Sequence, residues 1–330
     1  MKVKNLLIAL FMLTSAYKAS AQHDSSYYET HNDVTHLRLF LIQKRSTLTY
    51  TNAIDGTSCK YSPHTLPGLG VGFTYDWLTL NVSYGVPFNG NGDEKGKTKY
   101  LDVQLHVWAK KFIVDLSAQR YKGMYVPGDK DASGNFVHRS DVESRLLGGA
   151  FQYVLNNKRF SSRSSFLQTD WQKRSAGSLL VGFNAYVGRI TADSSLLPYQ
   201  SEVGPLDSHA KKDFFWQIGP TLGYAYTLVI KRHLFLTGSF TENLNYSRRI
   251  TTEESERKAT SRLAINPSFR LVTGYNTYRW GFGLSYVNNR VNISSEASSN
   301  GLAISSGTYR ANVVYRFRSK GKLGELIDKI

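Results

Sequence analysis

Alternation of apolar and polar side chains is the feature that most constrains the fold of this chain. It is clearest in residues 99–116, which read KYLDVQLHVWAKKFIVDL. One set of alternate positions is apolar, namely Leu101, Val103, Leu105 and Val107, and the other is polar, namely Asp102, Gln104 and His106. Because successive side chains of a strand point to opposite faces, this period of two predicts a strand between two different environments. The apolar face is either the core of a soluble sandwich or the lipid-facing surface of a transmembrane barrel.

The first 21 residues have the pattern of a secretory signal peptide. Lys2 and Lys4 precede an apolar run from Leu6 to Leu13, and the small residues 19–21 precede Gln22. This pattern predicts export with cleavage near Ala21. The apolar run is too short for a helix that spans about 30 Å of hydrocarbon. No later segment approaches about 18 consecutive apolar residues, so the exported chain is predicted to be either soluble or a β-barrel.

Charge and cysteine content narrow the classes of partner. The formal net charge is +16, and removal of Lys2, Lys4 and Lys18 with the signal peptide leaves +13. Such a basic balance favours nucleic acid or an anionic surface. Export argues against nucleic acid and favours phosphate-bearing lipopolysaccharide, with a merely solubilising charge as the alternative. Cys59 is the only cysteine, so neither an internal disulfide nor a thiolate metal cluster is predicted, and no cofactor is expected.

The alternation recurs along the chain and predicts twelve strands. They cover residues 36–54, 67–76, 77–86, 98–108, 110–122, 143–155, 177–190, 213–229, 232–249, 260–273, 278–291 and 307–318. The connections alternate short and long, as the periplasmic turns and outer loops of outer-membrane barrels do, whereas a sandwich has no reason to keep that parity. Residues 156–177 break this rule, because the segment is long where a short turn is due. It is either a further hairpin, which makes fourteen strands, or a periplasmic or lumenal excursion.

We therefore predict an all-β protein, an antiparallel up-and-down transmembrane β-barrel of about 12 strands (12–14). The expected organisation is a signal peptide at 1–21, a short periplasmic segment at 22–35, the barrel at 36–318 and a polar tail at 319–330. The expected location is the outer membrane of a Gram-negative bacterium. The expected partners are outer-membrane lipid, lipopolysaccharide and small polar solutes, with no nucleic acid.

Three segments carry a resemblance to a known family. They read WLTLNVSYG, KTKYLDVQLHVWAKKFIVDLSAQRYKGMY and NNKRFSSRSSFLQTDWQKRSAGSLLVG. On these segments the chain resembles the exported proteins of domain of unknown function 4421, a family typical of Bacteroides-type Gram-negative bacteria. The resemblance covers nearly all of the mature chain and implies an outer-membrane-barrel-like protein. It implies no activity, so no functional residue is carried over from it.

The polar face of the predicted barrel supplies the candidate site residues. Acids, a histidine and arginines are expected to line the lumen, namely Asp102, His106, Asp115, Arg270, Arg279, Arg310 and Arg316. Opposed charges in a lumen can have a functional role, in which they line a polar path or orient an anionic ligand. Alternatively they form a structural network, since buried charges are tolerated only when paired. Inward glycines at 68, 70, 72, 219, 223, 281 and 283 either leave volume in the lumen or allow the strands to bend.

Aromatic side chains near the predicted strand ends are expected to form the interfacial girdles of a barrel. They are Trp77, Trp108, Trp216, Trp280, Tyr309 and Phe317. Tryptophan and tyrosine favour the membrane–water interface because one part of the ring system is apolar and another part forms hydrogen bonds.

No residue is identified as catalytic or as a metal ligand. Asp102 and His106 share a face four residues apart, which is weak evidence for a base and its orienting acid. The loop Asp129–Phe136 begins like a calcium-binding loop, but Ser140 occupies the position of the required bidentate glutamate, which favours a plain turn. We therefore favour a non-enzymatic barrel, either a narrow pore or a surface-structural protein. The alternatives are a barrel enzyme acting on lipid or lipopolysaccharide and a secreted soluble binding protein.

Overall fold

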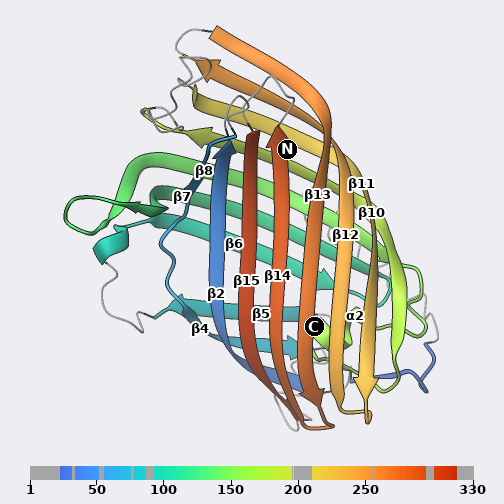
Figure 1. Cartoon of the computed structure of the whole chain (residues 1–330). Helices are drawn as coiled ribbons and strands as arrows, with labels where there is room; N and C mark the ends of the chain where they lie inside the picture. Colours follow the sequence, from blue (N-terminus) through green and yellow to red (C-terminus); the bar gives the residue numbers. More distant parts are fainter. Residues whose placement is uncertain are drawn as a thin grey trace, which may run out of the picture.

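The structure is a computed structural model that describes residues 23–31, 34–51, 56–75, 78–86, 93–194, 196, 210–253, 256–294 and 301–317. The predicted signal peptide and polar tail lie outside these residues. The described chain is folded almost entirely as antiparallel strands (Figure 1). It contains no helix that is long and apolar enough to cross a membrane.

Thirteen strands of the described chain form one antiparallel sheet. They are β2 (Thr35–Thr51), β3 (Ser58–Tyr61), β4 (Gly68–Tyr75), β5 (Leu78–Gly85), β6 (Lys99–Trp108), β7 (Phe112–Lys130), β8 (Phe136–Val154), β10 (Ala176–Thr191), β11 (Ala210–Ile230), β12 (Leu234–Glu253), β13 (Glu256–Asn276), β14 (Trp280–Ser294) and β15 (Gly301–Phe317). The spatial order is β5-β4-β2-β15-β14-β13-β12-β11-β10-β8-β7-β6, with β3 paired to β2. All twelve predicted strands are present and β3 is additional. The sheet curls into a barrel (Figure 1), so the predicted fold class is confirmed.

Several strands continue into segments that the sequence pattern assigns to loops. β7 and β8 reach Lys130 and Phe136, within the predicted loop at 123–141. β12 and β13 stay paired as far as Glu253 with Glu256, beyond the predicted strands that end at 249 and begin at 260. The reason is that backbone hydrogen bonds continue past the apolar belt, where both faces carry polar side chains and the alternation fades. The hairpin tip between β7 and β8 is a plain turn, in which the Asp131 carboxylate accepts the backbone N–H of Ser133 at 2.9 Å.

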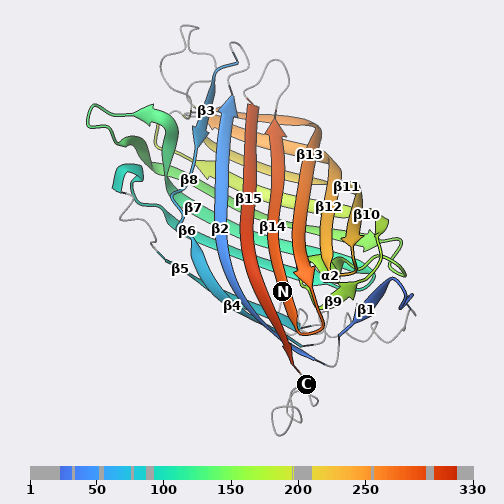
Figure 2. The ribbon, with the colours of Figure 1, turned by 60° about the horizontal axis from the view of Figure 1, so that its bottom comes forward.

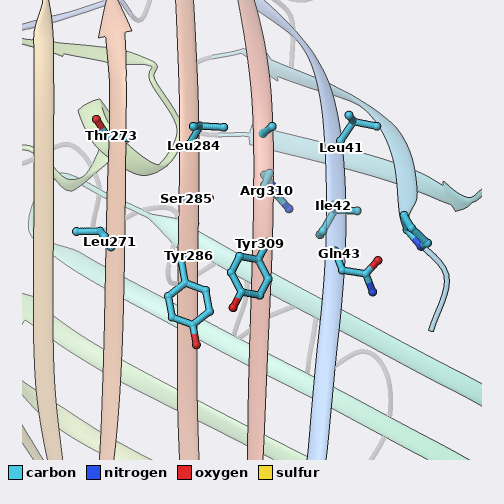
Figure 3. Close-up of a pocket in the computed structure, with 12 residues that line it drawn as sticks. Leu41, Ile42, Gln43, Leu271, Thr273, Leu284, Ser285, Tyr286, Tyr309 and Arg310 are labelled. Carbon is cyan, nitrogen blue, oxygen red and sulfur yellow. The ribbon is translucent and has the colours of Figure 1, made fainter. Parts of the chain in front are cut away.

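The two faces of the barrel wall differ as the alternation predicts. On β2, Leu39 is 54% exposed on the outer face while the adjacent Phe40 is 2% exposed on the inner face. The outer faces of four neighbouring strands carry an apolar surface (Figure 3), which includes Leu271, Leu284, Tyr286, Tyr309 and Leu41. The rings of Tyr286 and Tyr309 stack with centroids 4.6 Å apart. A barrel with this surface buries its apolar side chains in lipid.

Strands β5 and β6 are the two edges of the sheet, because the described residues show no backbone pairing between them. Both figures of the whole chain show them as the ends of the curled sheet (Figure 2). The sheet ends are joined farther along by a bridge in which Ser62 and Tyr125 exchange backbone hydrogen bonds of 2.9 Å. The Lys44 ammonium on β2 also reaches the Asp102 carboxylate on β6 at 3.0 Å. In the described residues, the backbone hydrogen-bond ladder of the barrel wall is therefore interrupted between β5 and β6.

The irregular segment at 156–177 is a lumenal excursion. It contains the short helix α2 (Ser162–Phe166) and the strand β9 (Asp170–Gln172). β9 pairs with β1 (Tyr28–Thr30) in a separate two-stranded sheet, so the alternative of a fourteenth barrel strand is wrong. From Phe160 to Asp170 every side chain except the half-buried Phe166 is buried, so no exposed face alternates with a buried one, whereas Lys158, Arg159 and Arg174 are exposed. Trp171 donates its indole N–H to the backbone oxygen of Arg232 at 2.7 Å, which places the segment at the end of the barrel with the short turns, called here the turn end.

Candidate functional site in the lumen

Residues 160–172, called here the plug, are held inside the barrel at its turn end. Two arginines of the wall donate to its backbone: Arg38 to the oxygen of Leu167, and Arg316 through Nε to the oxygen of Gln168 at 3.1 Å. The Gln168 side chain in turn donates to the backbone oxygen of Phe282 at 3.0 Å and accepts from Asn312 at 2.7 Å. The plug is therefore tied to β2, β14 and β15.

Short polar side chains suit the plug to this place. Ser162, Ser164 and Ser165 on α2 are all buried. Ser165 shares a hydrogen bond of 2.5 Å with Thr237 of β12. Ser161 donates its hydroxyl to the buried Asp170 carboxylate at 2.6 Å. Because buried polar groups require partners, a serine-rich segment is stable inside a polar lumen and not against lipid.

Amide and hydroxyl side chains fill the middle of the lumen. They are Asn184, Gln217, Thr221, Asn243, Asn245 and Asn266, all buried, and are called here the amide layer. Asn184 donates to Thr221 at 3.2 Å and to Asn243 at 3.1 Å, and Asn266 donates to Gln217 at 2.6 Å. These bonds join the inner faces of four consecutive strands, β10, β11, β12 and β13. The polar face that the alternation predicts is packed side chain against side chain at this level.

Apolar side chains fill the end of the lumen toward the long loops. They include Leu48, Tyr61, Met124, Ile190, Phe215, Ile293 and Leu302, all buried. An ion pair lies among them: Arg249 donates through Nε to Asp213 at 2.7 Å and through Nη2 to the Tyr50 hydroxyl at 2.9 Å. The lumen of the described chain is thus occupied by three successive layers, namely the plug, the amide layer and this apolar layer.

Asp115 is the centre of one predicted group of lumen charges. Its carboxylate accepts from Arg270, and its other oxygen lies 2.5 Å from Nδ1 of His106. The Arg270 guanidinium lies over the Trp108 ring at 5.2 Å, and Trp108 stacks on Phe166 of the plug at 4.3 Å. The His106 side chain is 42% exposed because β6 is an edge strand. The structure thus brings together three residues from β6, β7 and β13.

The other predicted lumen residues lie apart from that group. Asp102 binds Lys44 at 3.0 Å and accepts the Tyr121 hydroxyl at 2.7 Å. Arg316 holds the plug, and Arg310 lies over the Phe40 ring at 4.7 Å. Arg279 does not share the lumenal face: it is exposed in the turn between β13 and β14, because the strands end before it. No group of three or more His, Cys, Asp or Glu side chains in the described ranges is placed to hold a metal ion.

The aromatic residues expected in the girdles divide between the two faces. Trp77 lies outside the described residues. Trp108 is not a girdle residue, since it lies on the inner face with Asp102 and His106 and stacks on the plug. Trp280 and Tyr309 are exposed on the outer face, and Trp216 and Phe317 contact the neighbouring outer rings of Tyr246 and Tyr315, respectively. The prediction of Trp108 as a girdle residue rests on its position near a strand end. Its place in the alternation, on the same face as Asp102 and His106, predicts the inner face instead.

Sequence reasoning missed four charged residues that organise the lumen. They are Arg38, Arg163, Asp170 and the pair-forming Arg249, each buried. Arg38 alternates with Leu37 and Leu39, so the parity that identifies the other lumen charges also identifies it. Arg163 and Asp170 lie in the plug, where no period of two exists, and no sequence signal marks them as lumenal.

Residues 22–317 match the family described as "Domain of unknown function (DUF4421)". The chain belongs to the DUF4421 family. No curated protein matches this DUF4421 chain. Its architecture is similar to that of solved outer-membrane β-barrel proteins.

Three such structures differ in their described roles and in their similarity to this chain. The outer membrane protease OmpT from Escherichia coli is 11% identical, with a TM-score of 0.41 over 87% of the DUF4421 chain and 98% of OmpT. The translocator domain of the autotransporter NalP from Neisseria meningitidis is 9% identical, with a TM-score of 0.35 over 96% of each chain. The toluene transporter TodX from P. putida is 8% identical, with a TM-score of 0.29 over 88% of the DUF4421 chain and 91% of TodX. At these sequence identities and TM-scores, the similarity indicates no activity for this chain.

Proposed function

We propose that this protein is a closed outer-membrane barrel with a structural role at the cell surface. The outer belt of exposed leucine and aromatic side chains supports a membrane location, as does the predicted signal peptide. A secreted soluble binding protein would expose this belt to water, where an apolar surface of this extent is unfavourable. Lipid and lipopolysaccharide are then the surrounding partners of the barrel.

The attachment of the plug is the observation that carries this proposal. Arg38 and Arg316 bind consecutive backbone oxygens of the plug, at Leu167 and Gln168. Because hydrogen bonds from charged donors are among the strongest in proteins, these contacts favour a plug that stays in place. Of the two functions favoured by the sequence, the surface-structural one therefore agrees better with the lumen than a narrow pore for polar solutes does.

Conductance across a planar bilayer tests the proposal. The wild-type protein is expected to insert without producing stable conductance steps in potassium chloride. The double variant Arg38→Ala/Arg316→Ala removes the two charged attachments of the plug, leaves its neutral contacts with the wall, and is expected to raise the frequency of conducting steps. Arg279→Ala, which removes an exposed cation from a turn, is the matched control and is expected to remain closed. Steady conductance by the wild-type protein contradicts the proposal and favours the narrow pore.

A barrel enzyme acting on lipid or lipopolysaccharide is the second candidate. One observation favours it: His106 binds Asp115 through Nδ1 at 2.5 Å while its side chain is 42% exposed. A carboxylate that orients an accessible imidazole is one part of a general-base arrangement. Lipid hydrolysis by the purified barrel that is lost in His106→Ala supports the enzyme, whereas absence of hydrolysis in the wild-type protein argues against it.

A further inference from the structure

Four arginines gather in the barrel near the plug, and they outnumber the acid beside them. They are Arg38, Arg163, Arg310 and Arg316, called here the arginine cluster. Asp170 is the acid of the cluster, with its carboxylate 3.7 Å from Nε of Arg163. Arg38 donates to neutral oxygens of Asn81 and Leu167. The cluster therefore carries more positive charge than the one carboxylate of Asp170 neutralises.

Arg316 also uses its donors on neutral groups. It binds the backbone oxygens of Gln168, Thr277 and Trp280, and the side-chain oxygen of Asn276 at 2.7 Å. Hydrogen bonds of this kind satisfy the donors and leave the charge uncompensated. Arg316 is 3% exposed and Arg38 is 4% exposed, so water screens neither charge effectively.

Arg310 is the member of the cluster whose donors are free. In the part of the chain that the structure describes, it has no hydrogen-bond or ion-pair partner, and its guanidinium lies over the Phe40 ring at 4.7 Å. It leaves β15 on the face opposite to Tyr309, toward the lumen (Figure 3). Ser285 on β14 is its directly paired neighbour and lies on the same face.

A buried histidine lies beside Arg316, at the opposite end of the cluster from Arg310. Both ring nitrogens of His36 are buried without a hydrogen-bond partner, and the residue is 1% exposed. His36 pairs directly with Arg316 in the ladder between β2 and β15. Orphaned polar atoms beside uncompensated charge are unfavourable unless water or an ion completes the site.

We propose that the arginine cluster binds an oxyanion, with the Arg310 guanidinium as its direct donor. The planar fork of an arginine matches the two oxygens of a phosphate or carboxylate group. Arg38, which lies closer along the sheet to Arg310 than Arg316 does, contributes further positive charge, and Ser285, paired with Arg310 between β14 and β15, supplies a hydroxyl on the same face. The bound group is a phosphate or carboxylate, either free or as the headgroup of an amphiphile.

Thermal unfolding of the mature protein in detergent micelles tests the site, because a ligand that binds only the folded state raises the unfolding temperature. Sodium phosphate is compared with sodium chloride at equal ionic strength. In a parallel arm, micelles doped with phosphatidic acid are compared with micelles doped with phosphatidylcholine. A rise in either arm is expected for the wild-type protein. A rise with phosphate identifies a free anion, and a rise with phosphatidic acid alone identifies a headgroup.

Arg310→Gln separates binding from structure, with Arg279→Gln as the control that removes one exposed positive charge. Arg310→Gln is expected to abolish the rise and to weaken anion binding by about tenfold or more. Without added oxyanion it is expected to unfold at about the wild-type temperature, since the half-buried Arg310 forms no hydrogen bond or ion pair in the described residues for the variant to break. Arg279→Gln is expected to keep the full rise. The site is refuted if no oxyanion raises the unfolding temperature, or if Arg310→Gln retains the wild-type rise. These outcomes are independent of whether the barrel conducts.

Discussion

Arg316, in the last strand of the barrel, donates through Nε to the backbone oxygen of Gln168, 148 residues earlier in the sequence, at 3.1 Å. This contact joins β15, the last strand of the barrel, to the plug at the turn end. One buried guanidinium group therefore binds the plug to the barrel wall. Folding of the wall and seating of the plug are expected to be coupled.

That coupling predicts a large loss of stability in Arg316→Gln. The variant leaves backbone oxygens of Gln168, Thr277 and Trp280 without their charged donor. Each lost bond of this kind costs about 1.5–3 kcal/mol. Urea unfolding followed by heat-modified mobility on a detergent gel measures the change. Arg279→Gln should stay within about 0.5 kcal/mol of the wild-type protein, and an equal loss in both variants contradicts the role of Arg316.

The lumen charges around Asp115 predict a second effect on stability. Asp115→Asn removes the carboxylate shared by Arg270 and His106 and leaves Arg270 in the lumen without its acid. Breaking a buried ion pair in this way costs about 3–5 kcal/mol. The double variant Asp115→Asn/Arg270→Gln should recover part of that loss, because it removes the stranded charge. Urea unfolding of the single and double variants measures this, and a stable Asp115→Asn protein indicates a hydrated path.

Two glycines of the sheet predict opposite results for the same substitution. A Cβ at Gly182 in β10 would lie 1.8 Å from the backbone oxygen of Phe151 in β8, and backbone cannot move aside as a flexible side chain can. Gly182→Ala should therefore destabilise the barrel by about 1–3 kcal/mol or more. A Cβ at Gly238 in β12 meets nothing within 4 Å. Gly238→Ala should be neutral or stabilising by about 0.4–1 kcal/mol, and equal unfolding midpoints for the two variants would show that β8 and β10 are not so close.

Cys59 predicts slow reaction with thiol reagents. It is buried in β3 within the apolar layer, and burial raises the pKa of its thiol. A raised pKa lowers the thiolate fraction at pH 8, and the thiolate is the reactive form. Maleimide should modify the folded protein at least about tenfold more slowly than the heat-unfolded protein. The control is Cys59→Ala/Ser133→Cys, with the thiol in the exposed turn, which should react rapidly in both states.

The sequence by itself determines the faces of the strands. Alternate side chains point to opposite sides of any strand whatever its neighbours, so parity alone places Asp102, Asp115 and Arg270 inside and Leu101 outside. The same local rule predicts all twelve long strands. It also identifies Trp108 as an inner residue, although its position near a strand end suggested a girdle.

Only the tertiary structure decides which inward groups meet and what fills the lumen. Asp115 and Arg270 are 155 residues apart, and their contact depends on the curvature that brings β7 and β13 across from one another. The plug has no period of two, since most of its side chains are buried whichever way they point, and its place follows from hydrogen bonds to distant Arg38 and Arg316. The described residues show no backbone pairing between β5 and β6, and no local pattern in either strand indicates that they are edges. Local patterns specify the face of each strand, while long-range pairing specifies its partners.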